Sequence, residues 1–345
     1  MSFNSASNHF NIVDFITEFG VHSINLRDSY TAMHCHRVAI LASTLISDHL
    51  GNLKENNTAH YTKLTTTNPP YFEKLKKTLS DDDFLYGFPV LEFASRVHDL
   101  GKIGWDDETL IGIQKGDKDK PSSIDESKKR MHPIIGAKLL YKFFYKYNKI
   151  TLGAKSGENK TSNNYRDVVT LVLFHHWGFN SEKSYPIKDE YERCKNLKNL
   201  LSTDTSFLHP PPTTGEDDNV LRLFIGAIKI ADVFDALTTH RNYRKDLRCN
   251  EKSTIFFDDT NYNDIIFWLE KIVPCSLAIM EDEGMYHPQL LKILQNLSTD
   301  KTWLKSYFDL KNSPEQLIQK YLKYSLQKDD YCAISCLAPN ECKKA

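Results

Sequence analysis

Apolar residues recur at intervals of three and four along most of the chain, whereas runs that alternate strictly between apolar and polar residues are scarce. The first pattern has the period of a helix, so we expect a mainly helical protein rather than a β-rich one. The pattern predicts helices over residues 28–50, 84–100, 130–147, 164–178, 219–240, 262–280, 287–297 and 314–326. The expected fold class is all-α, a helical bundle without internal repeats.

Polar stretches rich in Lys, Asn, Ser, Thr, Asp and Pro separate several of these segments. They span residues 52–68, 116–127, 151–164 and 188–219. We interpret them as long loop insertions that interrupt the bundle without dividing it into separate domains.

Two histidines fall where helical spacing points them into a core. His34 lies in line with Val38, Leu41 and Leu45, at steps of four, three and four. Side chains at these steps share one face of a helix, so His34 faces inward with its apolar neighbours. His132 begins another predicted helix and points at similarly apolar surroundings.

The segment "RVHDLGKIGW" places His98 and Asp99 directly behind the apolar run 88–97. Both side chains can project from the last turn of that helix toward one point. We expect Gly101 to end the helix and to let the backbone turn sharply. Lys102 then adds a cation close to the pair.

Polar groups also lie within the most apolar segments of the chain. His175 and His176 close "DVVTLVLFHH", which is apolar almost all round and is therefore expected to be buried. Asp232 and Asp235 share the apolar face of "LFIGAIKIADVFDAL". A carboxylate in such surroundings must be hydrogen-bonded, ion-paired or bound to a metal.

A single histidine on an apolar face is usually a satisfied core residue, but a whole set of buried polar groups is costly unless something collects them. The inward set is His34, His98, Asp99, His132, His175, His176 and Asp232. Imidazole and carboxylate suit iron, manganese, nickel or zinc. Seven ligands exceed one site with open positions, so we expect two ions bridged by Asp99, about 3.5–4 Å apart, an arrangement typical of hydrolysis at phosphorus.

These residues, in this order, resemble the ligand signature of the HD superfamily of metal-dependent phosphohydrolases. His132 and the pair His175–His176 narrow the resemblance to its HD-GYP branch, the bacterial cyclic di-GMP phosphodiesterases. The strings "DSYTAMHCHRV", "HDLGKIG", "HPIIGAKLL" and "ADVFDALTTHRNYR" also resemble segments of that branch. The resemblance implies an HD-domain bundle between an N-terminal segment and a C-terminal helical extension, over residues 1–20, 21–297 and 298–345.

The resemblance also implies how the metal ligands are shared. The first ion would be held by His34, His98, Asp99 and Asp232, and the second by Asp99, His132, His175 and His176. Some members hold a third ion through a glutamate whose position is Tyr30 here. We therefore expect two divalent ions, iron or manganese.

Three cations match family positions that contact the substrate. The resemblance implies that Lys102 binds a substrate phosphate, so Lys102 and Asp99 are the expected catalytic residues. Arg241 and Arg244 match the arginines of the family's RxYR ending and would clamp a second phosphate. The alternative for these two arginines is a pair of weak surface ion pairs.

The loop after the paired histidines departs from the branch. In "HHWGFNSEKSYP" Trp177 replaces a glutamate and Ser184 replaces the glycine of Gly-Tyr-Pro, so Tyr185 and Pro186 remain as the expected substrate-binding residues. Trp177, Phe179 and Tyr185 either stack on a base or pack against the protein. The metal set is thus complete while the loop is degenerate.

Charge and composition narrow the partners. Lys and Arg number 44 and Asp and Glu 45, so no global field attracts nucleic acid or anionic lipid, and a small-molecule partner fits this balance better than DNA does. The resemblance implies that this small molecule is a nucleotide. With no apolar run of about 18 residues and no secretory signal pattern, we expect a cytoplasmic protein without membrane insertion. The seven cysteines suggest no disulfide framework, and we interpret Cys332, Cys336 and Cys342 as reduced thiols.

Three functions remain open at this stage. The first is a two-metal phosphodiesterase that hydrolyses a cyclic dinucleotide, with cyclic di-GMP as the leading substrate. The second is a phosphohydrolase for another nucleotide or a phosphomonoester. The third is a non-catalytic second-messenger receptor or interaction module, and the C-terminal tail could brace the core, cover the site, or bind a protein partner or a second copy of the chain.

Overall fold

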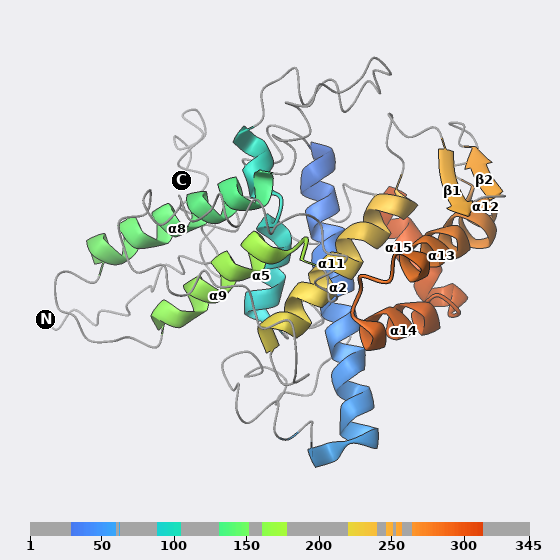
Figure 1. Ribbon diagram of the computed structural model, residues 1–345, viewed down its shortest axis with the longest axis horizontal. Coiled ribbons are helices and arrows are strands. Elements are labelled where there is room, and N and C mark those ends of the chain that lie inside the picture. The colour runs from blue at the N-terminus through green and yellow to red at the C-terminus, as the bar shows by residue number, and fades with distance from the viewer. Residues whose placement is uncertain are drawn as a thin grey trace, which may run out of the picture.

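The computed structural model describes residues 29–59, 62, 88–104, 131–151, 161–177, 220–239, 246–250, 253–256 and 264–312. This part of the chain is mostly helical and has one two-stranded sheet, which confirms the all-α prediction at the level of fold class (Figure 1). The predicted helix over 314–326 and the predicted loops over 116–127 and 188–219 lie outside the described residues.

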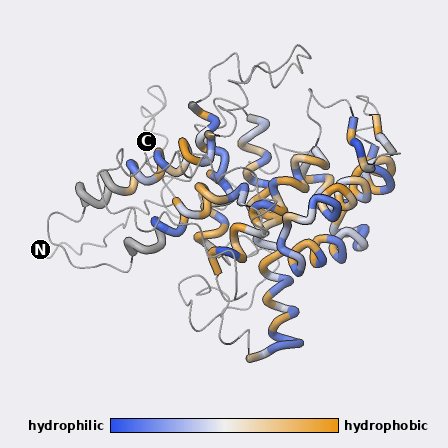
Figure 2. The backbone as a smooth tube through the Cα atoms, viewed as in Figure 1, coloured by the Kyte–Doolittle hydropathy of each residue, from blue (hydrophilic) through white to orange (hydrophobic). Residues whose placement is uncertain are grey.

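Two long helices, α2 (Ser29–Asn56) and α11 (Val220–Thr238), pack against each other at the centre of the molecule (Figure 1). Val38, Leu41 and Leu45 of α2 are fully buried, as their spacing with His34 predicts. Burying one such side chain contributes about 1.5–3 kcal/mol, so this apolar seam is a main source of stability. Figure 2 shows the hydrophobic segments of both helices meeting in the middle of the molecule.

The neighbouring layer contains α5 (Pro89–Val97), α8 (His132–Thr151) and α9 (Thr161–Phe174). Helix α5 packs against α2 and α9, and α9 packs against α8. Two predicted loop boundaries are wrong: the loop predicted over 52–68 begins too early, because α2 extends to Asn56, and the loop predicted over 151–164 ends too late, because α9 already starts at Thr161.

The chain after α5 differs from the prediction. Helix α5 ends at Val97 and the chain continues as a short 3₁₀-helix, η3 (Leu100–Gly104), so His98 and Asp99 lie in the turn between the two. The expected sharp turn at Gly101 is wrong. Among the described glycines the left-handed conformation belongs to Gly284, with φ of 59°, at the end of α13 (Val273–Glu283).

Gly101 is needed instead for a close approach between backbones. A Cβ atom on Gly101 would lie 1.8 Å from the carbonyl oxygen of His132 and 2.7 Å from the amide nitrogen of Gly136. The first turn of α8 therefore rests directly on η3. This contact fixes the distance between the His98–Asp99 turn and His132.

Helices α12 (Ile265–Phe267) and α13 are joined by a π-helical turn, η6 (Trp268–Ile272), into one continuous rod. Pro274 lacks a backbone N–H and cannot complete the α-helical pattern, and the N–H of Val273 instead donates to the carbonyl of Trp268.

Two further helices follow, α14 (Pro288–Leu297) and α15 (Lys301–Asn312). Helix α14 matches the prediction over 287–297, while α15 lies in the segment expected to form a helical tail. Leu304, Tyr307 and Phe308 of α15 belong to the main hydrophobic core. The described part of the tail therefore braces the core.

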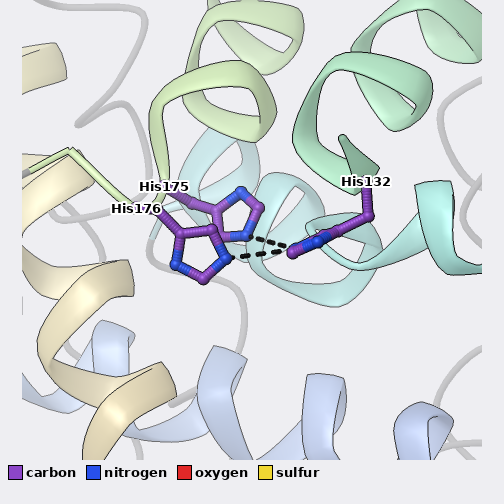
Figure 3. Close-up of side chains that lie close together, drawn as sticks. All are labelled: His132, His175 and His176. Carbon is purple, nitrogen blue, oxygen red and sulfur yellow. Dashed lines mark hydrogen bonds between the residues drawn. The ribbon is translucent and has the colours of Figure 1, made fainter. Parts of the chain in front are cut away.

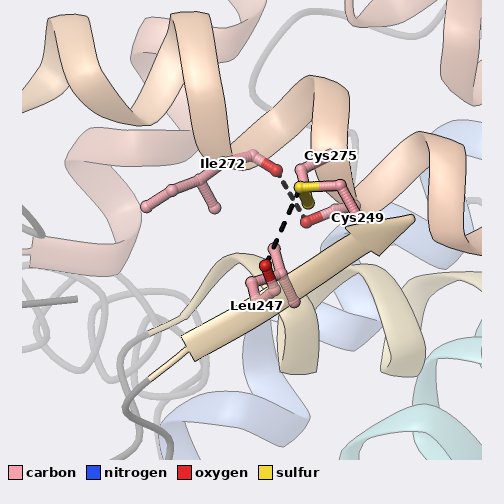
Figure 4. Close-up of a disulfide and its surroundings, with 5 residues drawn as sticks. Leu247, Cys249, Ile272 and Cys275 are labelled. Atoms are coloured by element: carbon pink, nitrogen blue, oxygen red, sulfur yellow. Dashed lines mark hydrogen bonds between the residues drawn. A yellow bond between two sulfur atoms is a disulfide. The ribbon is translucent and has the colours of Figure 1, made fainter. Parts of the chain in front are cut away.

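A small antiparallel hairpin, β1 (Asp246–Asn250) and β2 (Ser253–Phe256), follows α11 and was not predicted. A disulfide between Cys249 and Cys275 joins β1 to α13 (Figure 4). Closing a loop of 26 residues in this way stabilises a fold by roughly 3 kcal/mol. The sequence suggested no disulfide framework, whereas the structure contains this one disulfide among the described residues. Cys332, Cys336 and Cys342 lie outside the described residues.

Within the part of the chain that the structure describes, no helix has the length and apolar character required to cross a membrane.

The Gly101 contact can be tested by substitution. Gly101→Ala places a methyl group against the backbone of α8, and such overpacking should lower the free energy of unfolding by about 1–3 kcal/mol or more. Gly51→Ala is the control, because Gly51 lies on an exposed part of α2 with nothing within 4 Å of its Cβ position, and it should stabilise by about 0.5–1 kcal/mol. Chemical denaturation measures both changes, and equal stability of Gly101→Ala and wild type would contradict the contact.

Candidate metal centre

The structure brings all seven predicted ligands together at one point where five segments meet. They come from α2, from the turn after α5, from the start of α8, from the end of α9, and from α11. Three groups each hold ligand atoms within 4.8 Å of one another: His34, His98 and Asp99; His132, His175 and His176; and His98, His175 and Asp232. These distances are compatible with metal binding.

His98 contributes a buried ring nitrogen that could bind a metal ion. Its Nδ1 donates to the carbonyl of Ser95 at 2.7 Å, which leaves Nε2 as a lone-pair nitrogen. Nε2 is buried and has no hydrogen-bond partner among the described residues. It faces Asp99 Oδ2 at 3.6 Å and Asp232 Oδ1 at 3.9 Å. A cation between these atoms would satisfy all three, because each of them can only accept.

His132, His175 and His176 form the second group, with their Nε2 atoms turned toward one another (Figure 3). The Nε2 of His132 lies 3.3 Å from that of His175 and 3.1 Å from that of His176. His175 Nδ1 donates to the carbonyl of Val172 at 2.7 Å, so its Nε2 carries a lone pair. Three converging ring nitrogens cannot all be donors and acceptors for one another, whereas one metal ion would accept all three lone pairs.

Burial keeps two members of the second group, His175 and His176, in the neutral form that binds metals. It lowers the pKa of His175 well below its ordinary value, with a further contribution from His176. It also lowers the pKa of His176 to about 3, together with the nearby ring of His132. These two imidazoles are therefore unprotonated at neutral pH and need no proton release before binding.

Asp99 lies between the two groups of histidines, and each of its carboxylate oxygens faces a histidine of a different group. Oδ1 is 3.2 Å from His132 Nε2, and Oδ2 is 3.8 Å from His34 Nε2. Burial opposes ionisation of Asp99, but Lys102 and the nearby histidines outweigh it and hold its pKa well below the ordinary range. The carboxylate is thus charged and oriented as a bridge requires.

Lys102 forms an ion pair with Asp99 Oδ2. Its side chain is about one-fifth exposed, at 21%, whereas Asp99 is buried at 2%, so Lys102 lies at the rim of the site. In this structure the predicted phosphate-binding lysine therefore neutralises the charge of Asp99.

His34 is held between two carboxylates. Its Nε2 lies 3.0 Å from Asp232 Oδ1 and its Nδ1 lies 2.7 Å from Asp235 Oδ2. Burial alone would lower the pKa of His34, but the hydrogen bonds to Asp232 and Asp235 outweigh it and raise the pKa. Burial would also raise the pKa of Asp232, but its hydrogen bond and attraction to His34 hold it well below the ordinary value.

Two buried cations near the site, Arg37 and Lys229, were not predicted from the sequence. Arg37 donates from Nε to Asp235 Oδ1 at 2.6 Å and from Nη2 to Oδ2 at 3.0 Å. Lys229 is buried, donates to the carbonyl of His176 at 3.1 Å, and has a pKa lowered to about 8 by burial. Helical spacing could have found both cations, because Arg37 follows His34 by three residues and Lys229 precedes Asp232 by three.

The remaining predicted residues are only partly described. Trp177 packs edge-on against Phe174 at 5.5 Å between ring centroids, which favours packing over base stacking for this side chain. Tyr30 lies at the start of α2, where the family's third-metal glutamate would be. Four expected substrate-binding residues and one expected stacking residue lie outside the described residues: Tyr185, Pro186, Arg241, Arg244 and Phe179.

No protein-family model, curated protein or solved structure matches the chain. The case for a metal centre therefore depends on the arrangement of its own side chains. The resemblance to the HD-GYP branch stays a prediction.

The raised pKa of His34 makes metal affinity depend on pH. In the metal-free protein His34 carries a proton on each nitrogen, and a metal ion must displace the Nε2 proton. Below the raised pKa this displacement weakens binding, so the affinity for Mn²⁺ should increase with pH through that pKa and then level off. The ordinary histidine pKa is about 6.5, so the calorimetric titration series starts near pH 6 and is continued upward until the affinity levels off.

Calorimetry in buffers of different ionisation enthalpy should detect about one proton released per His34-bound ion. Asp309→Asn is a suitable control, because that carboxylate pairs with Lys305 on the exposed surface. An affinity that does not change with pH, or a release of no proton, would contradict this account of His34.

Proposed function

We propose that this chain is a metal-dependent phosphohydrolase with an HD-domain bundle, which hydrolyses a cyclic dinucleotide, with cyclic di-GMP as the leading substrate. The observation that carries the proposal is the position of Asp99, whose two oxygens face two separate histidine groups. Buried bridging carboxylates between histidine clusters are typical of two-metal hydrolytic sites.

The donor set fits two ions. One would be held by His34, His98, Asp99 and Asp232, and the other by Asp99, His132, His175 and His176. The ligands are nitrogen and oxygen donors without a thiolate, which suits iron or manganese. The lone-pair Nε2 of His98 and the three converging rings of the second group support this fit.

When bound, a pair of divalent ions supplies a hydroxide nucleophile at neutral pH and stabilises negative charge on the phosphoryl oxygens. The protein's own groups would do the rest. Asp99 remains ionised, and the Nδ1 bonds of His98 and His175 hold both rings in a fixed orientation. Lys102, at the rim, can leave Asp99 and donate to a phosphate oxygen as that oxygen gains charge.

The direct test is turnover by the full chain loaded with iron or manganese under anaerobic conditions. Cyclic di-GMP, other cyclic dinucleotides, linear nucleotides and phosphomonoesters are incubated in parallel, and products are separated by chromatography. We expect cyclic di-GMP to give the linear dinucleotide. Activity that spares cyclic dinucleotides would favour another nucleotide or monoester, and metal-loaded protein without any turnover would favour a non-catalytic receptor.

Asp99→Asn tests the bridge. It keeps the size of the side chain but removes the charge that both ions would share, so we expect loss of at least one of two bound ions and of turnover by about 10³-fold or more. Elemental analysis measures metal content and the chromatographic assay measures rate. Full metal occupancy and full activity in this variant would rule out Asp99 as the bridge.

Lys102→Ala tests whether Lys102 stabilises charge on a phosphate oxygen of the substrate. Loss of one charge-stabilising donor should lower kcat/KM by about 10²–10³-fold while both ions remain bound, because the lysine is not a ligand. Lys305→Ala is the matched control, since Lys305 lies on the exposed face of α15 and pairs only locally with Asp309. Equal rates for the two variants would contradict a catalytic Lys102.

A further inference from the structure

Asp235 is the most completely hydrogen-bonded carboxylate beside the metal centre. It is fully buried, and each of its oxygens accepts from two groups. Oδ2 accepts from His34 Nδ1 at 2.7 Å and from Arg37 at 3.0 Å. Oδ1 accepts from Arg37 at 2.6 Å and from the hydroxyl of Tyr307 at 2.8 Å. The carboxylate has no freedom to rotate without losing several of these bonds.

The bond to Nδ1 determines what His34 presents to the centre. With Nδ1–H donating to Asp235, only Nε2 is available toward Asp232 and Asp99. A carboxylate behind a histidine ligand fixes both the tautomer and the plane of the ring, and loss of such a partner typically costs 10–100-fold in metal affinity. Asp235 therefore has the position of an orienting group rather than of a ligand.

Tyr307 reaches Asp235 from a distant part of the sequence. It lies on α15, 72 residues after Asp235, in the segment that the resemblance leaves outside the domain. Burial and the charge of Asp235 raise the pKa of Tyr307 well above its ordinary value, so the hydroxyl keeps its proton and donates.

The ring of Tyr307 is fixed by aromatic neighbours. It stacks on Trp303 at 5.6 Å and on Trp268 at 6.5 Å between centroids. Trp268 is itself fully buried and donates from its indole nitrogen to the carbonyl of Thr238 at 2.9 Å. Asp300 caps the start of α15 by accepting from the backbone of Thr302 at 2.8 Å. The hydroxyl is therefore held at Asp235 by a rigid support.

We infer that Tyr307 is a positioning residue of the metal centre, which acts through Asp235 on His34 and makes α15 a working part of the site. The inference rests on the proposed metal centre but not on the identity of the substrate. It concerns one ion alone, because the second group, His132, His175 and His176, makes no contact with Asp235 among the described interactions.

The experiment is a titration of the full chain with cobalt(II), with visible absorption used to report the ligand field of each bound ion. Wild type should bind two ions. Tyr307→Phe removes one hydroxyl and preserves the ring, and it should weaken one binding event about tenfold and alter the spectrum of that ion alone. Asp235→Asn should weaken the same event further. Adding Tyr307→Phe to Asp235→Asn should cost little more, because Tyr307 acts through the carboxylate.

Phe308→Leu is the packing control. Phe308 neighbours Tyr307, packs on Trp268 at 5.3 Å, and carries no polar atom. It should lower the melting temperature of the protein while leaving both cobalt affinities and spectra unchanged. If Tyr307→Phe binds cobalt as wild type does, or if Phe308→Leu weakens the same event equally, α15 is only a structural brace and the inference is overturned.

The same data separate this inference from the proposed function. Wild-type protein that binds no cobalt would overturn both the metal centre and the role of Tyr307. Cobalt affinities that change as expected, in a protein that hydrolyses no cyclic dinucleotide, would overturn the proposed substrate and support the positioning role.

Discussion

The fold must offset the lost hydration of many imidazole and carboxylate groups that are buried together at one place. Removing these groups from water is costly, and the carboxylates Asp99 and Asp232 stay charged only because cations and histidines surround them. The hydrogen-bond donors and acceptors of these side chains do not balance, since His98 Nε2 has no hydrogen-bond partner among the described residues. A core of apolar residues alone would be easier to stabilise, so this cluster of polar side chains carries a cost, and its arrangement is compatible with metal binding.

Close backbone contacts, as well as side-chain contacts, fix the relative positions of the segments that carry the clustered histidines and aspartates. Gly101 lets η3 touch the first turn of α8, and a Cβ atom on Gly136 would lie 3.3 Å from Val172 Cγ1, so α9 is also near, although less tightly packed. Three of the segments that supply ligands therefore meet at distances set by missing side chains. The cost of this tight packing is that position 101 does not tolerate even a methyl group.

The sequence predicted which polar side chains gather at one place better than it predicted which residues support them. Helical spacing placed His34 inward and drew attention to Asp235, because both lie on strongly apolar faces. It could not identify Tyr307 as a partner of Asp235, since nothing local to either residue encodes a contact across 72 positions. It also misjudged Gly101, because a steric contact with α8 leaves no mark on the spacing of residues around it. The hairpin and its disulfide escaped prediction because the strands are only five and four residues long.

The π-helical turn η6 changes the direction in which the side chains along α12, η6 and α13 point. Trp268, Ile272, Ser276 and Met280 are all fully buried, although each follows the last by four residues. On an ideal α-helix such steps would drift by about 40° each and carry the last side chain roughly a third of the way round the axis. The wider turn over Trp268–Ile272 absorbs part of that drift. The π-helical turn thus helps these segments to keep buried side chains at every fourth position, from the tryptophan that stacks on Tyr307 to the methionine near the end of α13.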